Sequence, residues 1–328
     1  MKKIIYLLLA ISMFFFSCKS DKSSDINSNE ITNSLIPNTV SITYEQAMIV
    51  PQEYWFFKGI EFNKFIDELR NKTISGKIQP FFPMSTITLT KQDITDKFES
   101  NENFKLDEIK NLVFEENWNL DSSKFVMTKK VQAYSLVREY TRKTRFATEE
   151  QVKAIIARYD FSKNPDKKFS ELTLLQKDVA YEVALTNNDN PEWLEGIQVN
   201  HVKNVLIQKL ISKQVQAYSF MLRDTLTALS YDEVKQRMGE ETQTYINIDE
   251  TTGNEDTVKV DKKIEPSEIV GIAFIEDWYI DNKTMQIYKD VKGIGLVREY
   301  TKEMQGQESQ IARVIPFFVY FSNHKPNK

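Results

Sequence analysis

The sequence predicts an α+β fold made of two repeated helix-strand-helix-β-hairpin units, joined by a helical segment and with a mostly antiparallel sheet. First, residues 112–142 and 272–302 align without a gap and share twelve of 31 positions, where unrelated segments share about two. Second, apolar residues upstream of each copy recur at helical spacing. Third, the strands of each copy alternate apolar and polar residues. The constant separation of 160 residues indicates a duplicated supersecondary unit.

The N-terminus carries a processing signal, residues 1–17. Lys2 and Lys3 precede the apolar run 4–16, which is too short to span a bilayer. Cys18 is the only cysteine of the chain and directly follows this run and Ser17, an arrangement that resembles the lipobox of bacterial lipoproteins. We therefore expect Cys18 to be the acylated N-terminus of the mature protein. An ordinary secretory signal with an incidental cysteine is the alternative.

Residues 18–43 are rich in Ser, Asn, Asp and Thr, a composition that predicts a disordered tether. The formal net charge of the chain is −4, so it lacks the basic surface of a nucleic-acid-binding protein. We expect no nucleic-acid partner. No later segment is long and apolar enough to span a bilayer, so attachment to the outer membrane would depend on the N-terminal lipid.

The two repeated units are expected over residues 44–145 and 199–322, with a short tail at 323–328. Each begins with a helix whose apolar residues recur at helical spacing: Phe62, Phe65, Ile66 and Leu69 in the first unit, and Val202, Val205, Leu206 and Leu210 in the second. An extended run follows each helix, at 77–81 and 214–218. A short helix is then predicted where a hydroxyl cap precedes an acidic residue by three positions, at Thr90 with Asp93 and at Ser230 with Glu233.

The connections are predicted from composition and from helix-breaking or strand-breaking residues. Residues 146–198 form a helical connector, with helices after Thr148 and after Ser170 and a turn-rich break at 187–191. A long acidic loop is expected at 239–268. The run 314–321 predicts a final strand, and Pro316 favours an edge position because proline has no N–H to donate. The strand glycines predict bulges or close backbone approach, at Gly271, Gly293 and Gly295.

The residues shared by the two copies gather on one face of each predicted hairpin. If four-residue loops at 121–124 and 281–284 join the strands, Glu116 faces Lys129 and Glu276 faces Lys289. Such a cross-strand pair contributes roughly 0.2–1 kcal/mol and helps to fix the register. Alternatively, it is a polar handle within an apolar contact surface. The whole face comprises Phe114, Glu116, Trp118, Lys129 and Val131, and in the second copy Phe274, Glu276, Trp278, Lys289 and Val291.

An identical run, Leu-Val-Arg-Glu-Tyr-Thr, ends the second strand of each hairpin. It contains Arg138 and Glu139 in the first copy and Arg298 and Glu299 in the second. Neighbouring strand residues point to opposite faces, so the arginine and glutamate of one run cannot pair with each other. They are expected either to form structural salt bridges or to lie in an interface with another protein, where arginine is often an anchor.

Three runs of the second copy carry a family resemblance: Val-Gln-Ala-Tyr at 215–218, Ile-Glu-Asp-Trp-Tyr-Ile-Asp at 275–281 and Pro-Phe-Phe-Val-Tyr-Phe at 316–321. In this order they resemble the GldN/PorN family of gliding-motility and type IX secretion proteins. The resemblance is strongest over 200–322 and weaker over 54–142. It implies a non-enzymatic component of an envelope assembly that contacts other envelope proteins, among them a ring-forming lipoprotein. Family members carry ordinary secretory signals and one clear copy, so this chain departs in its lipobox and its duplication.

No catalytic, metal or cofactor site is expected. The chain has two histidines, His201 and His324, and no free cysteine, which excludes a His/Cys zinc site. The acidic run 249–256 lacks the spacing of a calcium loop, and no nucleophile or nucleotide motif is present. The expected protein is a non-enzymatic lipoprotein of the outer membrane, on its periplasmic face or exposed at the surface. The alternative is an envelope lipoprotein module that binds peptide or glycan.

Overall fold

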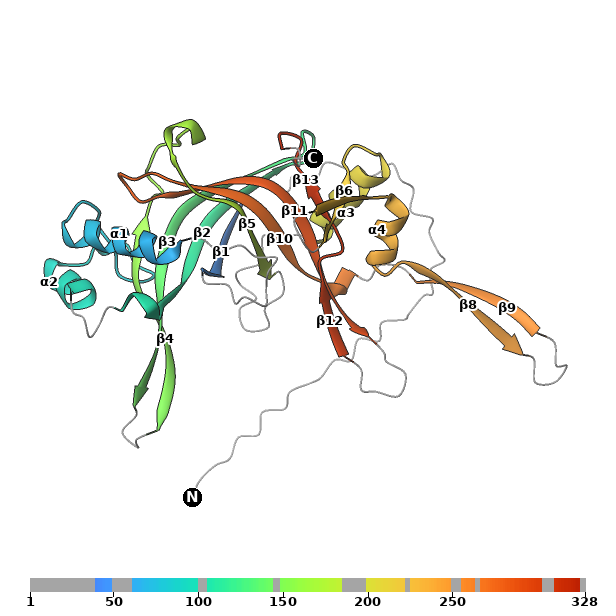
Figure 1. Ribbon diagram of the computed structural model, residues 1–328, viewed down its shortest axis with the longest axis horizontal. Coiled ribbons are helices and arrows are strands. Elements are labelled where there is room, and N and C mark those ends of the chain that lie inside the picture. Colours follow the sequence, from blue (N-terminus) through green and yellow to red (C-terminus); the bar gives the residue numbers. More distant parts are fainter. Residues whose placement is uncertain are drawn as a thin grey trace, which may run out of the picture. The chain divides into compact units, whose positions relative to one another are not determined.

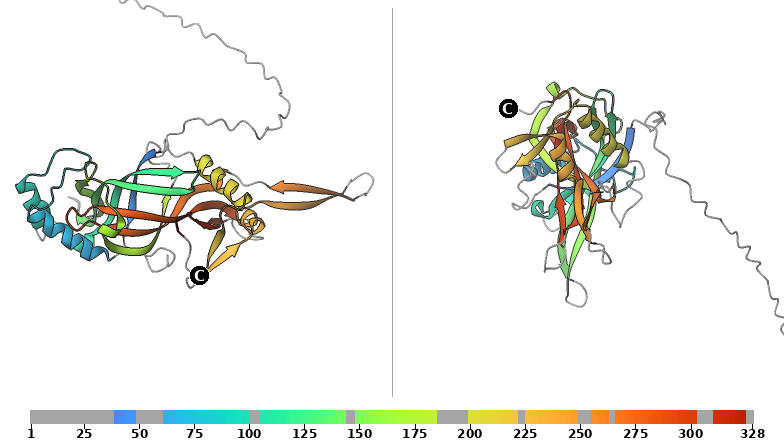
Figure 2. Two further views of the ribbon diagram at one scale, coloured as in Figure 1. Left: turned by 90° about the horizontal axis from the view of Figure 1, so that it is seen from above. Right: turned by 90° about the vertical axis from the view of Figure 1, so that its right-hand side faces the viewer.

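Antiparallel strands dominate the computed structural model, which describes residues 39–48, 61–99, 105–143, 148–184, 199–221, 225–248, 255–262, 266–302 and 310–324. The signal peptide, Cys18, residues 19–38 of the tether and the break at 187–191 lie outside these residues. Within them, eleven strands form one sheet and two further strands pair separately (Figures 1 and 2). None of the described helices is long and apolar enough to cross a membrane.

The predicted fold of α+β units joined by a helical segment is wrong. The two segments expected to be helices in the connector are the strands β4 (Glu149–Asp160) and β5 (Thr173–Ala184). Their buried residues alternate, at Ala157 and Tyr159 in β4 and at Val179, Tyr181 and Val183 in β5. Each strand also hydrogen-bonds along a hairpin strand, β4 to β3 and β5 to β10. Short apolar runs satisfy both helical and extended spacing, and here strand pairing decides between them.

The first half of the chain contributes four strands to this sheet, in the order β1-β2-β3-β4, all antiparallel. α1 and α2 lie between β1 and β2 in the sequence, and α1 buries its apolar face in the same core cluster as β2 and β3. The elements are β1 (Thr39–Ala47), α1 (Phe62–Ile74), α2 (Lys91–Ile94), the π-helical turn η1 (Thr95–Glu99), the 3-10 turn η2 (Leu106–Glu108), β2 (Ile109–Asp121), β3 (Val126–Lys143) and β4.

The second half repeats this order. β5 pairs with β10, β10 with β11, and β11 with both β12 and β13. The elements that follow the 3-10 turn η3 (Phe169–Glu171) and β5 are α3 (Val199–Ile211), β6 (Ala217–Met221), β7 (Thr225–Leu229), α4 (Tyr231–Arg237), β8 (Glu241–Ile248), β9 (Glu255–Lys262), the 3-10 turn η5 (Pro266–Glu268), β10 (Ile269–Ile280), β11 (Ile287–Lys302), β12 (Gln310–Val314) and β13 (Phe318–Tyr320).

The repeated unit is larger than the sequence comparison predicts. β1 pairs with β2 at Tyr44 and Phe114, as β5 pairs with β10 at Tyr181 and Phe274. The equivalence continues past the hairpins, where the amide of Phe161 donates to the carbonyl of Gln132 (2.7 Å) and the amide of Phe321 donates to that of Lys292 (2.9 Å). The structural boundary between the copies therefore falls between β4 and β5.

The predicted helix starts are confirmed. Both capping boxes are present: the Thr90 hydroxyl accepts from the amide of Asp93, and the Ser230 hydroxyl accepts from the amide of Glu233. α1 buries all four apolar residues that predict it, and α3 buries Leu206 and Leu210. The two short capped helices, α2 and α4, and the apolar faces of the longer helices α1 and α3 thus follow from local sequence.

Two further expectations are corrected. The loop expected at 239–268 contains the hairpin β8–β9, which pairs only with itself in the described residues. β13 is not an edge strand, because it pairs with β11 on one side and β6 on the other. Pro316 instead separates β12 from β13. The close approach predicted for the glycines is confirmed, since a Cβ at Gly293 or Gly295 would lie 2.6 Å from the carbonyl oxygen of Val319 or Phe317.

Candidate functional site

The two hairpins place the residues shared by the copies on one buried face, but in a different register from the one expected. Glu116 lies opposite Val131, and Trp118 lies opposite Lys129. The second copy has the same register, with Glu276 opposite Val291 and Trp278 opposite Lys289. The predicted facing pairs, Glu116 with Lys129 and Glu276 with Lys289, are therefore wrong.

The aspartate at the end of each first strand explains the displaced register. Asp121 still pairs with Val126, so the four-residue loop begins one position later than predicted. The Asp121 carboxylate accepts from the amides of Ser123 and Lys124, both at 3.0 Å. The loop ends at Phe125, whose φ is 51°, and its equivalent Met285 has φ 62°. An aspartate whose side chain accepts from the amides of the following turn can itself remain the last residue of the strand, so that the loop begins at the next residue.

The glutamates and lysines pair between the copies rather than within them. Lys129 Nζ lies 2.7 Å from Glu276 Oε1, and Lys289 Nζ lies 2.7 Å from Glu116 Oε1. All four side chains are fully buried. The exchange occurs where β3 and β11 meet in a β-bridge at Lys129 and Lys289. We call Glu116, Lys129, Glu276 and Lys289, with Tyr44 and Tyr181, the central charge cluster.

Two tyrosines complete the central charge cluster. Lys289 donates to the Tyr44 hydroxyl (2.8 Å) and Lys129 donates to that of Tyr181 (2.9 Å), while the two hydroxyls lie 3.1 Å apart. Tyr181 also donates to Glu276 Oε2 at 2.8 Å. Sequence reasoning missed both tyrosines, although Tyr-Glu-x-Ala occurs at 44–47 and again at 181–184. That short repeat is the signal that could have found them.

Aromatic side chains line the cluster, and two of them donate hydrogen bonds to its carboxylates. The indole N–H of Trp118 donates to Glu116 Oε2 at 2.7 Å, and that of Trp278 donates to Glu276 Oε2 at 2.8 Å. The ammonium of each lysine also lies over aromatic rings: Lys129 is 3.0 Å from the ring centroid of Phe274, and Lys289 is 3.5 Å from that of Phe114. Cation–π attraction of this kind is strongest away from water.

Burial and the opposite charges set the ionisation of the cluster. Burial opposes ionisation of Glu116, but the ammonium groups of Lys289 and Lys129 outweigh it and hold the pKa of this carboxyl below its usual value. Burial lowers the pKa of Lys129 to about 8, although the carboxylates of Glu276 and Glu116 oppose that change. Burial, with the nearby carboxylates, raises the pKa of Tyr44 and Tyr181 well above 10. Near neutral pH Glu116 and Lys129 are therefore charged, and Tyr44 and Tyr181 are neutral.

The charged groups of the cluster are closed off from solvent. Its carboxylates and ammonium groups are fully buried and paired, so they cannot contact a solute. Loss of one partner would leave an uncompensated buried charge, which costs about 3–5 kcal/mol. The cluster thus fixes how the two copies meet.

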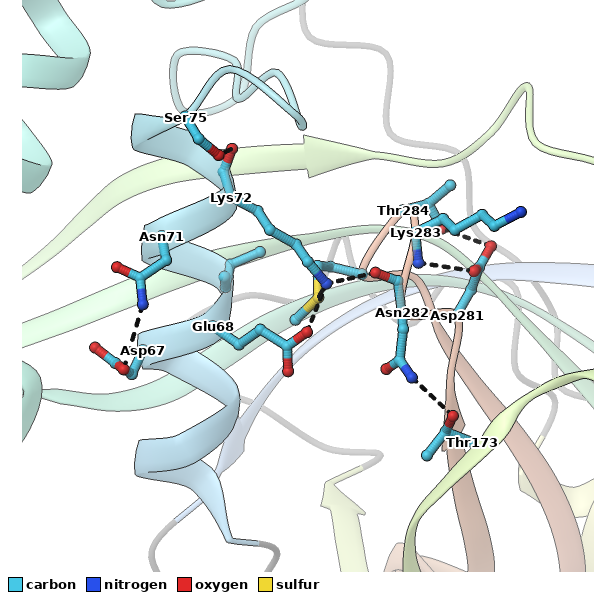
Figure 3. A network of polar contacts seen from close by, with 12 residues as sticks. Asp67, Glu68, Asn71, Lys72, Ser75, Thr173, Asp281, Asn282, Lys283 and Thr284 are labelled. Atoms are coloured by element: carbon cyan, nitrogen blue, oxygen red, sulfur yellow. Dashed lines mark hydrogen bonds and ion pairs between the residues drawn. The ribbon is translucent and has the colours of Figure 1, made fainter.

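The turn of each hairpin is also hydrogen-bonded by residues of the other copy. Lys72 of α1 donates to the backbone carbonyl of Asn282 and to Met285 Sδ (3.2 Å), as Figure 3 shows for the turn at 281–284. The Tyr134 hydroxyl of β3 donates to the carbonyl of Met285 at 2.9 Å. In the opposite direction, the Ser322 hydroxyl donates to the carbonyl of Lys124 at 2.9 Å. Each copy therefore supports the turn of its counterpart.

The duplicated strand ends form two equivalent ion pairs. Arg138 donates to Glu108 and Arg298 donates to Glu268, each from Nε at 2.6 Å. Each guanidinium also lies over the tyrosine two residues later, at 4.2 Å from Tyr140 and 4.1 Å from Tyr300. The glutamates face other partners: Glu139 lies 3.5 Å from Lys153 and Glu299 lies 3.1 Å from Arg313. The two runs are thus placed alike in both copies, with Thr141 and Thr301 exposed at their ends.

No group of three or more His, Cys, Asp or Glu residues that could hold a metal ion occurs in the described part of the chain. His324 lies 3.0 Å from Asp290, while the side chain of His201 and most of the acidic run 249–256 lie outside the described residues.

Comparison with known proteins gives one family. No curated protein matches the chain. Residues 170–327 match the family described as "Gliding motility associated protein GldN". The match starts just before β5 and ends after β13. It therefore covers the second copy as the strand pairing defines it. The second copy of this chain is therefore similar to the gliding motility associated GldN family over residues 170–327.

Proposed function

We propose that this protein is a non-enzymatic, lipid-anchored component of the cell envelope that assembles with other envelope proteins of the gliding motility or type IX secretion machinery. The family match of the second copy supports the process. The observation that supports a non-enzymatic role is the buried central charge cluster. The charged residues repeated in both copies pair with each other inside the protein, where they stabilise the fold and are not accessible to a substrate.

The partner surface in this proposal is the pair of duplicated strand ends. Glu139 and Thr141 of one copy and Glu299 and Thr301 of the other reach solvent there, beside the half-buried Arg138 and the buried Arg298. Each arginine is held by a glutamate of the preceding 3-10 turn and stacked on a tyrosine, so the surface is ordered before a partner arrives. An ordered surface loses little conformational entropy on binding. β12, which follows one of these runs, leaves Ile311 73 % exposed.

The anchor in this proposal is the acylated Cys18, which holds the folded part near the outer membrane on its periplasmic side. The lipobox supports this placement, and a ring-forming lipoprotein is the envelope partner that the family resemblance favours. A single acyl chain gives marginal membrane binding, so stable attachment would draw on several chains or on the protein partners as well.

Site-specific photo-crosslinking in whole cells tests the proposal. A photoreactive residue at Thr141 or Thr301, both exposed, should capture envelope proteins, and the same proteins at both positions. Lys91 on α2 is an exposed control position that should capture fewer. Cys18→Ala should move the protein from the membrane fraction to the soluble fraction of the envelope.

Three outcomes would contradict the proposal. Capture of the same proteins from Lys91 alone would reject the strand ends as the surface. A monomer that co-purifies only with a saturable small ligand would favour a binding module for peptide or glycan. Substrate turnover lost on a single carboxylate substitution would establish an enzyme.

A further inference from the structure

The contacts between the two halves are reciprocal. Lys129 of the first half pairs with Glu276 of the second, and Lys289 of the second pairs with Glu116 of the first. The rings repeat this exchange: Phe114 packs edge-on against Trp278 at 5.5 Å, and Trp118 against Phe274 at 5.0 Å. When residue i contacts j and the equivalent of j contacts the equivalent of i, the interface is isologous, as in two-fold dimers.

Within each half the strands pair mainly with one another. β1 to β4 pair with one another along their length, and β5 pairs with β10 and β10 with β11. Between the halves, the described strands share one β-bridge, at Lys129 and Lys289. The halves are therefore held together by side chains on their inner faces, and hardly by a shared strand ladder.

The inner face of each half is specific for another unit of the same kind. Each face presents one carboxylate and one ammonium, all without exposure to water. An apolar partner would bury these charges unpaired, at a cost of several kcal/mol. A unit with the same glutamate and lysine, turned by a two-fold rotation, pairs both charges at once.

We propose that residues 39–161 and 173–321 are two protomers of a fused two-fold dimer, and that their interface holds without the covalent connection at 162–172. The connection itself touches the second half, through Asn164 to Gln286 (3.0 Å) and Lys167 to Asp281 (2.5 Å). These contacts add to the interface between the halves. They are not part of the two exchanged ion pairs, and they do not involve the central charge cluster.

The test uses the whole chain without its signal peptide, with a protease recognition sequence inserted after Lys163, an exposed residue of the connection. After folding and purification the chain is cut and passed through a sizing column. The two fragments should elute together at the volume of the uncut chain. Urea unfolding of the cut protein should depend on concentration, because unfolding now releases two chains. A tenfold dilution should lower the ratio of folded to unfolded cut protein tenfold, which reduces its apparent free energy of unfolding by about 1.4 kcal/mol, and should leave the uncut chain unchanged.

A substitution at the interface tests whether the exchanged ion pairs hold the fragments together. Lys129→Met in the same format should weaken association of the fragments at least tenfold, while Lys110→Met, at an exposed position of β2, should leave it unchanged. Separation of the fragments in buffer, loss of folded structure on cutting, or an unfolding midpoint of the cut protein that ignores concentration would each overturn the proposal. Equal effects of the two methionine substitutions would do so as well.

Discussion

Exchanging the charges inside one copy should do far more damage than exchanging them between copies. The first variant combines Glu116→Lys with Lys129→Glu, and the second combines Glu116→Lys with Lys289→Glu. Both variants contain two substitutions of the same kinds and leave the net charge unchanged. In the first, each introduced charge meets a like charge in the other copy. In the second, the ion pair is reversed but kept.

The distances set the size of the difference. At 2.7 Å, each opposite pair attracts by about 6 kcal/mol at an effective dielectric constant of about 20, and a like pair repels by the same amount. Measured losses for a broken buried pair are about 3–5 kcal/mol. The first variant breaks two pairs and should lose at least about 6 kcal/mol, comparable to the whole stability of a typical domain. The second keeps both pairs and loses the indole hydrogen bond of Trp118 and a cation–π contact, about 2–4 kcal/mol.

Urea unfolding at neutral pH measures the difference, with tryptophan fluorescence as the signal because Trp118 and Trp278 border the cluster. We expect the second variant to purify as a folded protein with a lower midpoint. The first should unfold at little or no urea, or yield no folded protein. A first variant as stable as the second would mean that the lysines pair inside their own hairpins, and it would refute the exchanged arrangement.

Four other perturbations test individual contacts, and the effect of each is measured as a change in the free energy of unfolding in urea. Between about pH 8 and pH 10 the unfolded chain still binds the Lys129 proton that the folded chain has released, so stability should rise with pH, and Lys129→Met should remove this rise. Below pH 4.5 it should fall, because the folded state depresses the pKa of Glu116 and the unfolded chain takes up that proton first. Gly295→Ala should cost about 1–3 kcal/mol, since its Cβ would lie 2.6 Å from a carbonyl oxygen. Gly271→Ala should cost less, because its Cβ would lie 3.1 Å from the nearest carbonyl oxygen. Ser230→Ala removes a helix cap and should cost about 1 kcal/mol, and no loss would show that the cap is dispensable.

Local sequence was sufficient for the features that depend on local chemistry. The capping boxes at Thr90 and Ser230 mark the starts of α2 and α4, and the apolar spacing from Phe62 to Leu69 marks α1. The glycines at 293 and 295 mark close backbone approach. The duplicated face was also recognised residue by residue, because alternation along a strand fixes which residues share a side.

Features that depend on pairing between distant segments were not predictable in this way. β4 and β5 carry apolar residues whose spacing also fits a helix, and only their neighbours β3 and β10 make them strands. The exchange of partners is hidden for a different reason. Because both copies have a glutamate and a lysine at the same spacing, a contact within a copy and the same contact between copies predict the same sequence pattern.

A double-mutant cycle tests the exchanged pairing most directly. The coupling free energy between Lys129→Met and Glu276→Gln is compared with that between Lys129→Met and Glu116→Gln, from urea unfolding of the same chain. The exchanged arrangement predicts that the first coupling exceeds the second by at least about 1 kcal/mol, since Lys129 Nζ lies 2.7 Å from Glu276. Equal couplings, or a larger one within the first hairpin, would contradict it.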